Sequence, residues 1–166
     1  MTDSRRLVDK LWAYCDVLRD DGVGVLEYTE QLTYLLFLKM AHERATRRLA
    51  PERILPEKYD WQRLLDASGM ELEVLYTQML LDLAKEPGVV GTIFRKSQNR
   101  IQDPAKLQRL VHDLISQEHW TGTGTDITGD AYESLLAKGA SDKGSGAGQY
   151  FTPRPLIQAM VDVIDP

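Results

Sequence analysis

The 166-residue sequence has a single cysteine, no long hydrophobic run and no excess of basic residues. With Cys15 alone, an internal disulfide is excluded, and the place of this residue on an apolar helical face predicts a small buried side chain. The longest apolar run, near residues 35–40, is far shorter than the roughly 20 residues that a membrane-spanning helix needs. The N-terminus is polar and has no signal-like core. These absences predict a protein of the reducing cytoplasm that has no membrane partner.

Basic side chains are outnumbered in this chain. Twenty Lys and Arg residues face 25 Asp and Glu residues, which gives a formal net charge of −5. A domain that grips DNA by itself normally has a basic surface, because it neutralises phosphates, so the sequence disfavours autonomous DNA binding. Two local clusters could be phosphate contacts or solvated helix ends: Arg44, Arg47, Arg48 and Arg53, and then Arg95, Lys96 and Arg100.

Patterns that would indicate catalysis or a metal are also missing. The three histidines, His42, His112 and His119, have neither cysteine partners nor an i, i+4 spacing, so no zinc site is predicted. Residues 139–145 have the glycine spacing of a phosphate-binding loop, but the lysine that should follow is absent. No Gly-x-Ser-x-Gly turn offers a nucleophile. We therefore predict no catalytic residue and no metal ligand in this chain.

Apolar residues recur at helical spacing along most of the sequence. The spacing and the capping residues predict helices over residues 4–20, 27–49, 61–67, 70–85, 103–118 and 126–138. The helix over 27–49 has the widest apolar face and should be central. Residues 89–94 are rich in β-branched side chains, but Gly91 interrupts them, so a short helix or an irregular segment is expected. The sequence thus predicts a compact all-α bundle with a glycine-rich exit.

The last twenty residues combine a glycine-rich loop with the start of a helix. Thr152 can cap a helix that starts at Pro153, because the first turn needs no proline N–H. Its apolar face, which we expect to be buried, consists of Leu156, Ile157, Met160, Val161 and Ile164. The glycines would let the backbone approach a ligand, and the helix amides could bind a carboxylate or a nucleoside. Local chemistry alone favours a surface loop followed by an ordinary capped helix, because Gly/Ser clusters are usually loops.

Four sequence blocks, in the same order, resemble one known family. They are residues 7–20, the LLFLKM segment at 35–40, the block at 130–136 that is similar to GDxYExLL, and the QYFTPR segment at 149–154. Together they cover nearly the whole chain. The chain resembles the modification (M) subunits of type I restriction–modification systems, which are N6-adenine DNA methyltransferases.

The resemblance implies a helical domain at residues 1–138, a Gly/Ser-rich linker at 139–148 and the start of an S-adenosyl-L-methionine-dependent α/β methyltransferase domain at 149–166. It implies that the cofactor is held in part by Gln149, Tyr150, Phe151, Thr152, Pro153 and Arg154, although the two aromatic residues could instead be hydrophobic plugs beneath the site. The family's D-P-x-x-G-x-G and N-P-P-[FY] motifs do not occur here. We therefore expect the catalytic sheet to lie beyond residue 166, and these 166 residues alone to be inactive.

The family also implies partners. M subunits work with a specificity (S) subunit, a second M subunit and a restriction subunit, and they meet double-stranded DNA through that complex. The helical domain would then serve mainly subunit assembly and closure around DNA. Two rival readings remain: a non-enzymatic helical adaptor that shares this domain, and an orphan methyltransferase with its own target recognition region.

Overall fold

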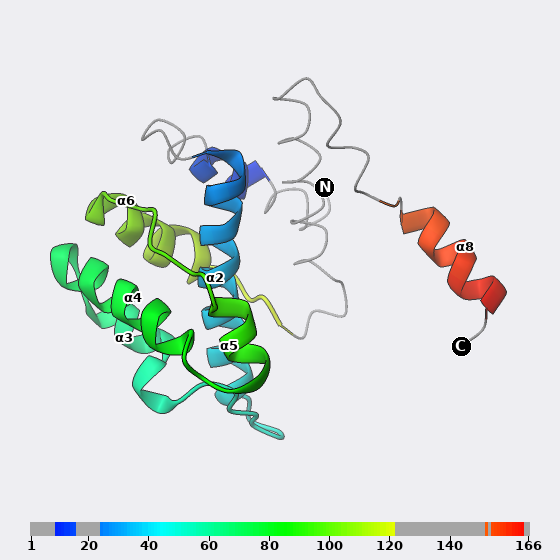
Figure 1. Cartoon of the computed structure of the whole chain (residues 1–166), viewed down its shortest axis with the longest axis horizontal. Coiled ribbons are helices and arrows are strands. Elements are labelled where there is room, and N and C mark those ends of the chain that lie inside the picture. Colours follow the sequence, from blue (N-terminus) through cyan, green and yellow to red (C-terminus); the bar gives the residue numbers. More distant parts are fainter. Residues whose placement is uncertain (1–8, 16–23, 122–151, 153, 165–166) are drawn as a thin grey trace.

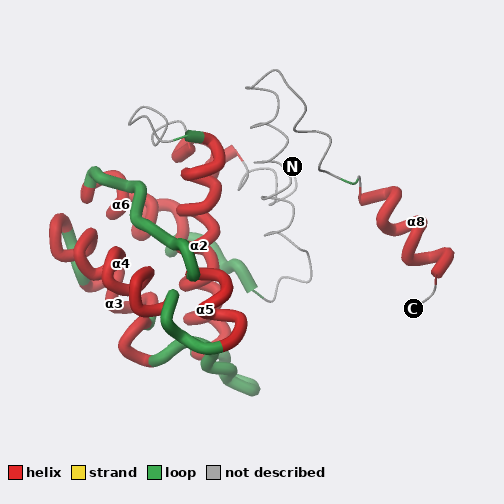
Figure 2. Tube along the Cα trace, in the orientation of Figure 1, coloured by secondary structure: helices red, strands yellow, loops and turns green. Residues whose placement is uncertain are grey.

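The computed structural model describes residues 9–15, 24–121, 152 and 154–164, and its regular structure there is helical throughout (Figures 1 and 2). Residues 9–15 are helical, and the elements that follow are α2 (Val25–Ala45), the 3₁₀ turn η1 (Glu57–Tyr59), α3 (Trp61–Asp66), α4 (Gly69–Leu83), α5 (Gly88–Phe94), α6 (Pro104–Arg109), the π-helical η2 (Leu110–Ile115) and α8 (Arg154–Ile164). The predicted fold class, a mainly α chain with a helical bundle, is confirmed. None of the described helices is long and apolar enough to cross a membrane.

Helix α2 forms the centre of the bundle, as its wide apolar face predicted. In Figure 1 it runs upright, with α3, α4 and α6 gathered on one side of it. It packs against α3 and η2, and its leucines Leu32, Leu35 and Leu38 are almost fully buried. Burying each such side chain contributes roughly 1.5–3 kcal/mol. Cys15 belongs to the same core, which confirms its predicted burial.

The C-terminal end of α2 differs from the prediction. The helix expected over residues 27–49 ends at Ala45. The backbone amide of Glu52 donates a hydrogen bond to the carbonyl of Arg44 at 3.0 Å, and Ala50 adopts a positive φ of 51°, so the chain turns back over the helix end. This reversal depends on a contact eight residues apart, which helical periodicity does not reveal. The arginines that follow residue 45 therefore lie on an exposed loop and not on a helix.

A buried glutamine on α2 fixes the segment that follows α5. The Gln31 side chain is fully buried, and its amide nitrogen donates to the carbonyl of Gln98 at 2.9 Å. Its amide oxygen accepts a hydrogen bond from the backbone N–H of Arg100 at 3.2 Å. Both polar ends of the side chain are thus satisfied, as burial requires. Gln31 therefore ties the loop at residues 98–100 to the central helix.

The helix predicted over residues 103–118 begins where expected but changes its winding. The Asp103 carboxylate accepts a hydrogen bond from the Ala105 amide at 2.8 Å, which confirms the predicted cap. From Leu110 the helix widens into a π turn, and the Ser116 amide bonds to the carbonyl of Val111. The Ser116 hydroxyl also accepts a hydrogen bond from the Trp61 indole at 2.9 Å. The Trp61 side chain of α3 therefore contacts the residue that follows the π turn. We attribute the change of winding to tertiary packing, because helical periodicity does not predict it.

Tyr76 on α4 carries a buried hydroxyl with no hydrogen-bond partner among the described residues. Because an unsatisfied buried polar group is costly, we expect Tyr76→Phe to raise the free energy of unfolding by about 1 kcal/mol at pH 8. Burial raises the pKa of the Tyr76 phenol above its ordinary value of 10.0, with smaller effects from Tyr34 and Glu30. Burial therefore favours the protonated phenol in the folded state. The wild-type protein keeps its full stability from this group below pH 10 and loses stability as the pH rises above 10, because the phenol of the unfolded chain ionises there.

Urea unfolding at pH 8 and above pH 10 measures this effect, and the gap between Tyr76→Phe and the wild type should widen at the higher pH. Tyr34→Phe is the matched control, since its hydroxyl donates to the Glu30 carboxylate at 2.5 Å. That variant should lose stability. A Tyr76→Phe protein less stable than the wild type at pH 8 would show that the hydroxyl has a partner after all.

Candidate functional site

Most of the predicted cofactor site lies outside the described residues. Gln149, Tyr150, Phe151 and Pro153 are among the residues that the structure does not describe, as are the blocks at 130–136 and 139–148. Thr152 is exposed just ahead of α8, and Arg154 is the first residue of that helix. The described part of a helix therefore begins next to the predicted site. The roles of these six residues remain predictions.

Helix α8 presents its apolar face to solvent. Leu156, Ile157, Met160 and Val161 are 45–52% exposed, and Ile164 is 68% exposed. Figure 2 shows no described helix beside α8. The expectation that this face is buried is therefore wrong within the described structure. The strong segregation of apolar and polar side chains still requires a partner surface for the face in a stable protein.

The Glu43 carboxylate, near the C-terminal end of α2, accepts several hydrogen bonds from a distant part of the chain. Its side chain is only 8% exposed. It accepts hydrogen bonds from the backbone N–H of Trp120 at 3.0 and 3.2 Å, and from the backbone N–H and the hydroxyl of Thr121, both at 2.9 Å. We call these contacts the Glu43 clamp. They tie Trp120 and Thr121, the last described residues of the bundle, to α2.

Lys39 balances the charge of the clamp. Its ammonium lies 3.4 Å from a Glu43 oxygen, one helical turn away, and its side chain is only 11% exposed. His119 lies at the rim, with its Nδ1 atom 4.0 Å from the same carboxylate. Two charges removed from water are tolerated only when they are paired and hydrogen-bonded, as they are here. Sequence reasoning missed this group, because Lys39 and Glu43 have the i, i+4 spacing of an ordinary exposed pair.

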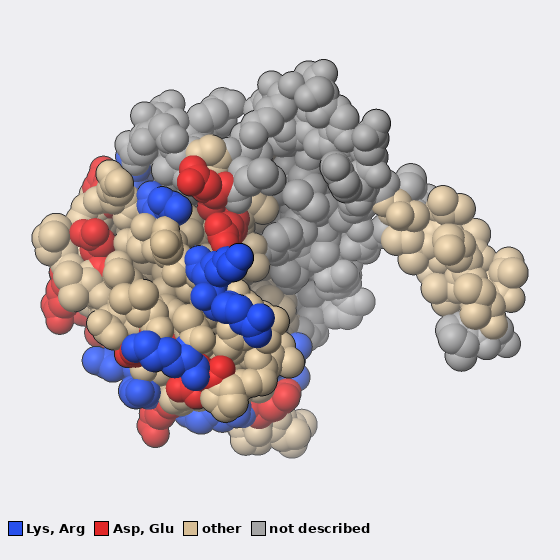
Figure 3. All heavy atoms as spheres, in the orientation of Figure 1, with Lys and Arg blue, Asp and Glu red and all other residues tan. Residues whose placement is uncertain are grey.

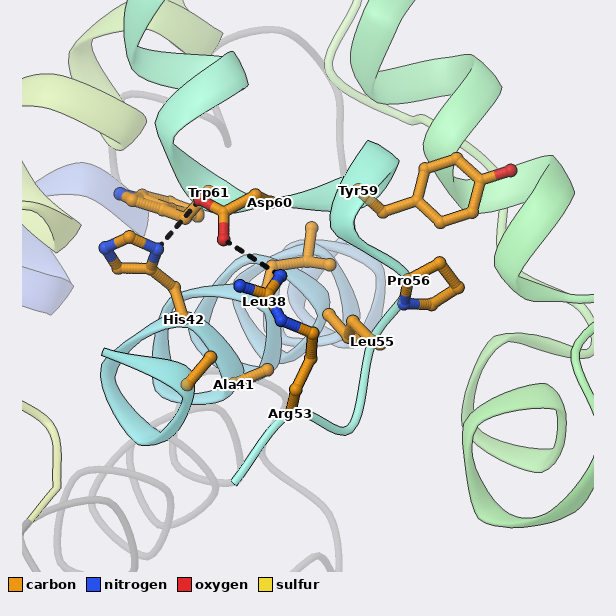
Figure 4. A pocket seen from close by; sticks show the side chains of 10 residues that line it. Leu38, Ala41, His42, Arg53, Leu55, Pro56, Tyr59, Asp60 and Trp61 are labelled. Carbon is orange, nitrogen blue, oxygen red and sulfur yellow. Dashed lines mark hydrogen bonds and ion pairs between the residues drawn. The ribbon is translucent and has the colours of Figure 1, made fainter. Parts of the chain in front are cut away.

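A second polar cluster joins α2 to the start of α3 (Figure 4). The Asp60 carboxylate caps α3 by accepting a hydrogen bond from the Gln62 amide at 2.9 Å. The same oxygen lies 2.8 Å from His42 Nδ1, and Arg53 approaches the other oxygen at 3.9 Å. The adjoining cavity of about 10 Å³ has room for about one water molecule and not for a cofactor. The cluster therefore serves as a helix anchor.

An open hollow lies beside α5. Its volume is about 490 Å³, and its lining includes the exposed residues Val89, Thr92 and Arg95. A binding pocket usually has converging polar groups with restricted motion, which this surface does not present. Within the described ranges, no cluster of three or more His, Cys, Asp or Glu side chains could hold a metal ion.

The two basic clusters lie on the surface and are partly paired with acids. Arg100 approaches Glu27 at 3.8 Å, and Arg44 approaches Glu52 at 4.0 Å. Figure 3 shows small groups of basic side chains with acidic side chains beside them on the face in view. Such mixed charge is typical of a solvated surface and gives little net attraction for phosphate.

Two family models match consecutive parts of the chain. Residues 7–114 match the HsdM N-terminal domain, and residues 123–166 match N-6 DNA Methylase. The Glu43 clamp holds Trp120 and Thr121, which lie between the two matches.

Curated proteins and a solved structure show the same relationship. The chain is 39% identical to the type I restriction enzyme EcoKI methylase subunit of Escherichia coli K12 and 40% identical to the StySPI methylase subunit of Salmonella potsdam. Each alignment covers 96% of this chain and 30% of the relative. The crystal structure of the EcoKI M protein superposes with a TM-score of 0.59 at 31% identity, over 97% of this chain and 27% of that one. The chain thus spans about 30% of the length of these relatives, and it belongs to the family defined by the HsdM N-terminal domain.

Proposed function

We propose that this chain is the N-terminal part of the modification subunit of a type I restriction–modification system. The whole subunit would transfer a methyl group from S-adenosyl-L-methionine to N6 of adenine in a specific DNA site. The observation that carries this proposal is the order of the two family matches on one chain, a helical domain followed directly by the start of an adenine methylase. The same order argues against the non-enzymatic adaptor, which would need only the first match.

The chemistry would proceed beyond the described bundle. A methylase of this class must bring an adenine out of the duplex, at a cost of a few kcal/mol of unstacking, before its N6 atom can reach the methyl donor. The cofactor supplies an activated methyl group when bound, so the protein's part is to hold donor and acceptor in line. We assign cofactor binding and the orientation of the methylase domain to this chain, and we assign no catalytic residue to it. The division into 1–138, 139–148 and 149–166 is also a proposal, and the two family matches meet earlier than this division, at residues 115–122.

The cofactor-binding part of the chain would be residues 149–154. Two observations support this assignment: the segment lies inside the N-6 DNA Methylase match, and α8 starts within it. Free amides at a helix start, with the positive end of the helix dipole, favour a carboxylate such as that of the methionine moiety. The exposed apolar face of α8 would be covered by the rest of the methylase domain in the longer protein.

Replacing Gln149, Tyr150 and Phe151 together with alanine tests the site. In the longer protein that continues past Pro166, we expect the Kd for S-adenosyl-L-methionine to rise at least about tenfold, since hydrogen bonds and ring packing worth more than 1.4 kcal/mol are removed. Isothermal titration calorimetry measures the change. Gln158→Ala, which removes only a hydrogen bond to Asp162 on α8, is the matched control and should keep the wild-type Kd. An unchanged Kd in the triple variant would contradict the assignment.

The helical domain would make protein contacts in the complex. Its outer surface on α4 exposes Met70, Val74 and Leu81 at helical spacing, and its net charge does not favour DNA. Exposed apolar side chains of this kind suit a protein partner better than phosphate. We assign the contacts to the specificity subunit or to a second M subunit, with the restriction subunit and DNA joining through the complex in the cytoplasm.

A further inference from the structure

The junction between the two matched parts of the chain is held by one side chain. Residues 115–122 separate the helical match from the methylase match, and Trp120 and Thr121 are the last described residues before the second. Glu43 lies 77 and 78 residues earlier in the chain and accepts their hydrogen bonds. No periodic or capping pattern requires this contact. It is a tertiary contact made between the end of the helical match and the start of the methylase match.

The geometry of the clamp fixes the direction of the chain as well as its position. Both Glu43 oxygens receive the Trp120 amide, and one of them also receives the Thr121 amide and hydroxyl. The Trp120 indole is buried and donates to the carbonyl of Ile115 at 2.8 Å. The segment is therefore held on two sides, by a charge-assisted set of hydrogen bonds and by a packed ring, which restrains both translation and rotation.

We propose that Glu43 is a positioning residue that sets how the helical domain is oriented toward the methylase domain. This inference rests on the proposed function. When the clamp is closed, Trp120 and Thr121 are fixed against α2 between the two family matches, and the two domains present a single geometry to DNA. When it opens, only a fraction of molecules has that geometry. The apparent affinity for DNA then falls by that fraction, while the reaction in correctly bound molecules is unchanged.

The test uses the longer protein assembled with its specificity subunit. Glu43→Gln keeps the shape of the side chain but removes the charge that attracts the amides and Lys39. Thr121→Val removes only the hydroxyl bond to Glu43. The matched control is Thr46→Val, which removes hydroxyl bonds to the backbone carbonyls of His42 at 2.9 Å and Glu43 at 3.4 Å at the same end of α2, and leaves the Glu43 carboxylate and its partners in place. Hydrogen exchange at residues 120–121 reports clamp opening, and steady-state methylation reports KM and kcat separately.

We expect exchange at residues 120–121 to become about tenfold faster in Glu43→Gln and Thr121→Val. The KM for DNA should rise by roughly three- to tenfold in these two variants, with kcat and the Kd for S-adenosyl-L-methionine within about twofold of the wild type. Thr46→Val should match the wild type in every measurement. A purely structural role would instead lower the active fraction, which reduces kcat and leaves KM unchanged.

Three results would overturn the proposal: faster exchange with unchanged KM, a fall in kcat alone, or an equal change in Thr46→Val. A wild-type complex that methylates no DNA would be a different failure, since it would remove the proposed function while the exchange measurements still report the clamp.

Discussion

Replacing Gly91 with alanine is expected to destabilise the helical domain by roughly 3 kcal/mol or more. A Cβ atom at this position on α5 would lie 1.8 Å from the backbone oxygen of Glu86 and 3.0 Å from its carbonyl carbon. The obstacle is backbone in the turn between α4 and α5, where the Glu86 amide is itself bonded to the carbonyl of Leu83 at 3.1 Å. The turn cannot yield without losing that bond or moving α5. Urea unfolding of the wild-type and Gly91→Ala proteins measures the loss of stability.

Gly88→Ala provides the control for Gly91→Ala. Gly88 has a positive φ of 73° but no atom within 4 Å of the added Cβ. Its cost should be that of backbone strain alone, about 1–2 kcal/mol. Gly91→Ala should therefore be clearly worse than Gly88→Ala, although both change a glycine of the same helix. Equal costs would mean that the close approach of α5 to the turn is not a real constraint.

The second large effect is expected at Glu43. Glu43→Ala should lower the free energy of unfolding by about 3–5 kcal/mol, because breaking a buried pair leaves the Lys39 charge without its partner. The amides of Trp120 and Thr121 also lose their acceptor. Chemical unfolding monitored by tryptophan fluorescence suits this variant, since Trp120 lies at the clamp.

Glu52→Ala is the matched control for Glu43→Ala. Its carboxylate is 59% exposed and lies 4.0 Å from Arg44, so the same change of residue type should cost within about 0.5 kcal/mol. If Glu43→Ala is no more costly than Glu52→Ala, the clamp is not closed in solution. The double variant Lys39→Met, Glu43→Leu apportions the cost of Glu43→Ala, since it removes the unpaired Lys39 charge and keeps only the loss of the acceptor for the Trp120 and Thr121 amides.

The helices could be predicted from the sequence wherever local chemistry decides. The Asp103 cap and the helical spacing of α4 depend on residues within a few positions of each other, and both predictions are confirmed. The segment at 89–94, where a strand was less favoured because of Gly91, is helical. Pattern and propensity are sufficient for features of this kind.

Contacts between distant residues set the features that were missed. The early end of α2 accompanies a chain reversal after residue 45. The π turn at η2 accompanies a hydrogen bond from the Trp61 indole to Ser116. The close approach of Gly91 to the backbone of Glu86 and the contacts of the Glu43 clamp also depend on the folded arrangement, which a local sequence pattern does not reveal. For the cofactor site the limit is different: the six residues were proposed through the family resemblance, and four of them lie outside the described structure.

The central claim is that this chain begins an adenine methylase, and methyl transfer to DNA tests it most directly. The longer protein, purified with its specificity subunit, is incubated with DNA containing the target site and S-adenosyl-L-methionine with a labelled methyl group. Digestion and mass spectrometry then identify the modified nucleoside. We predict that the label appears on N6 of adenine. Label on cytosine, or no label from a folded complex that binds the DNA, would contradict the account and favour a helical adaptor.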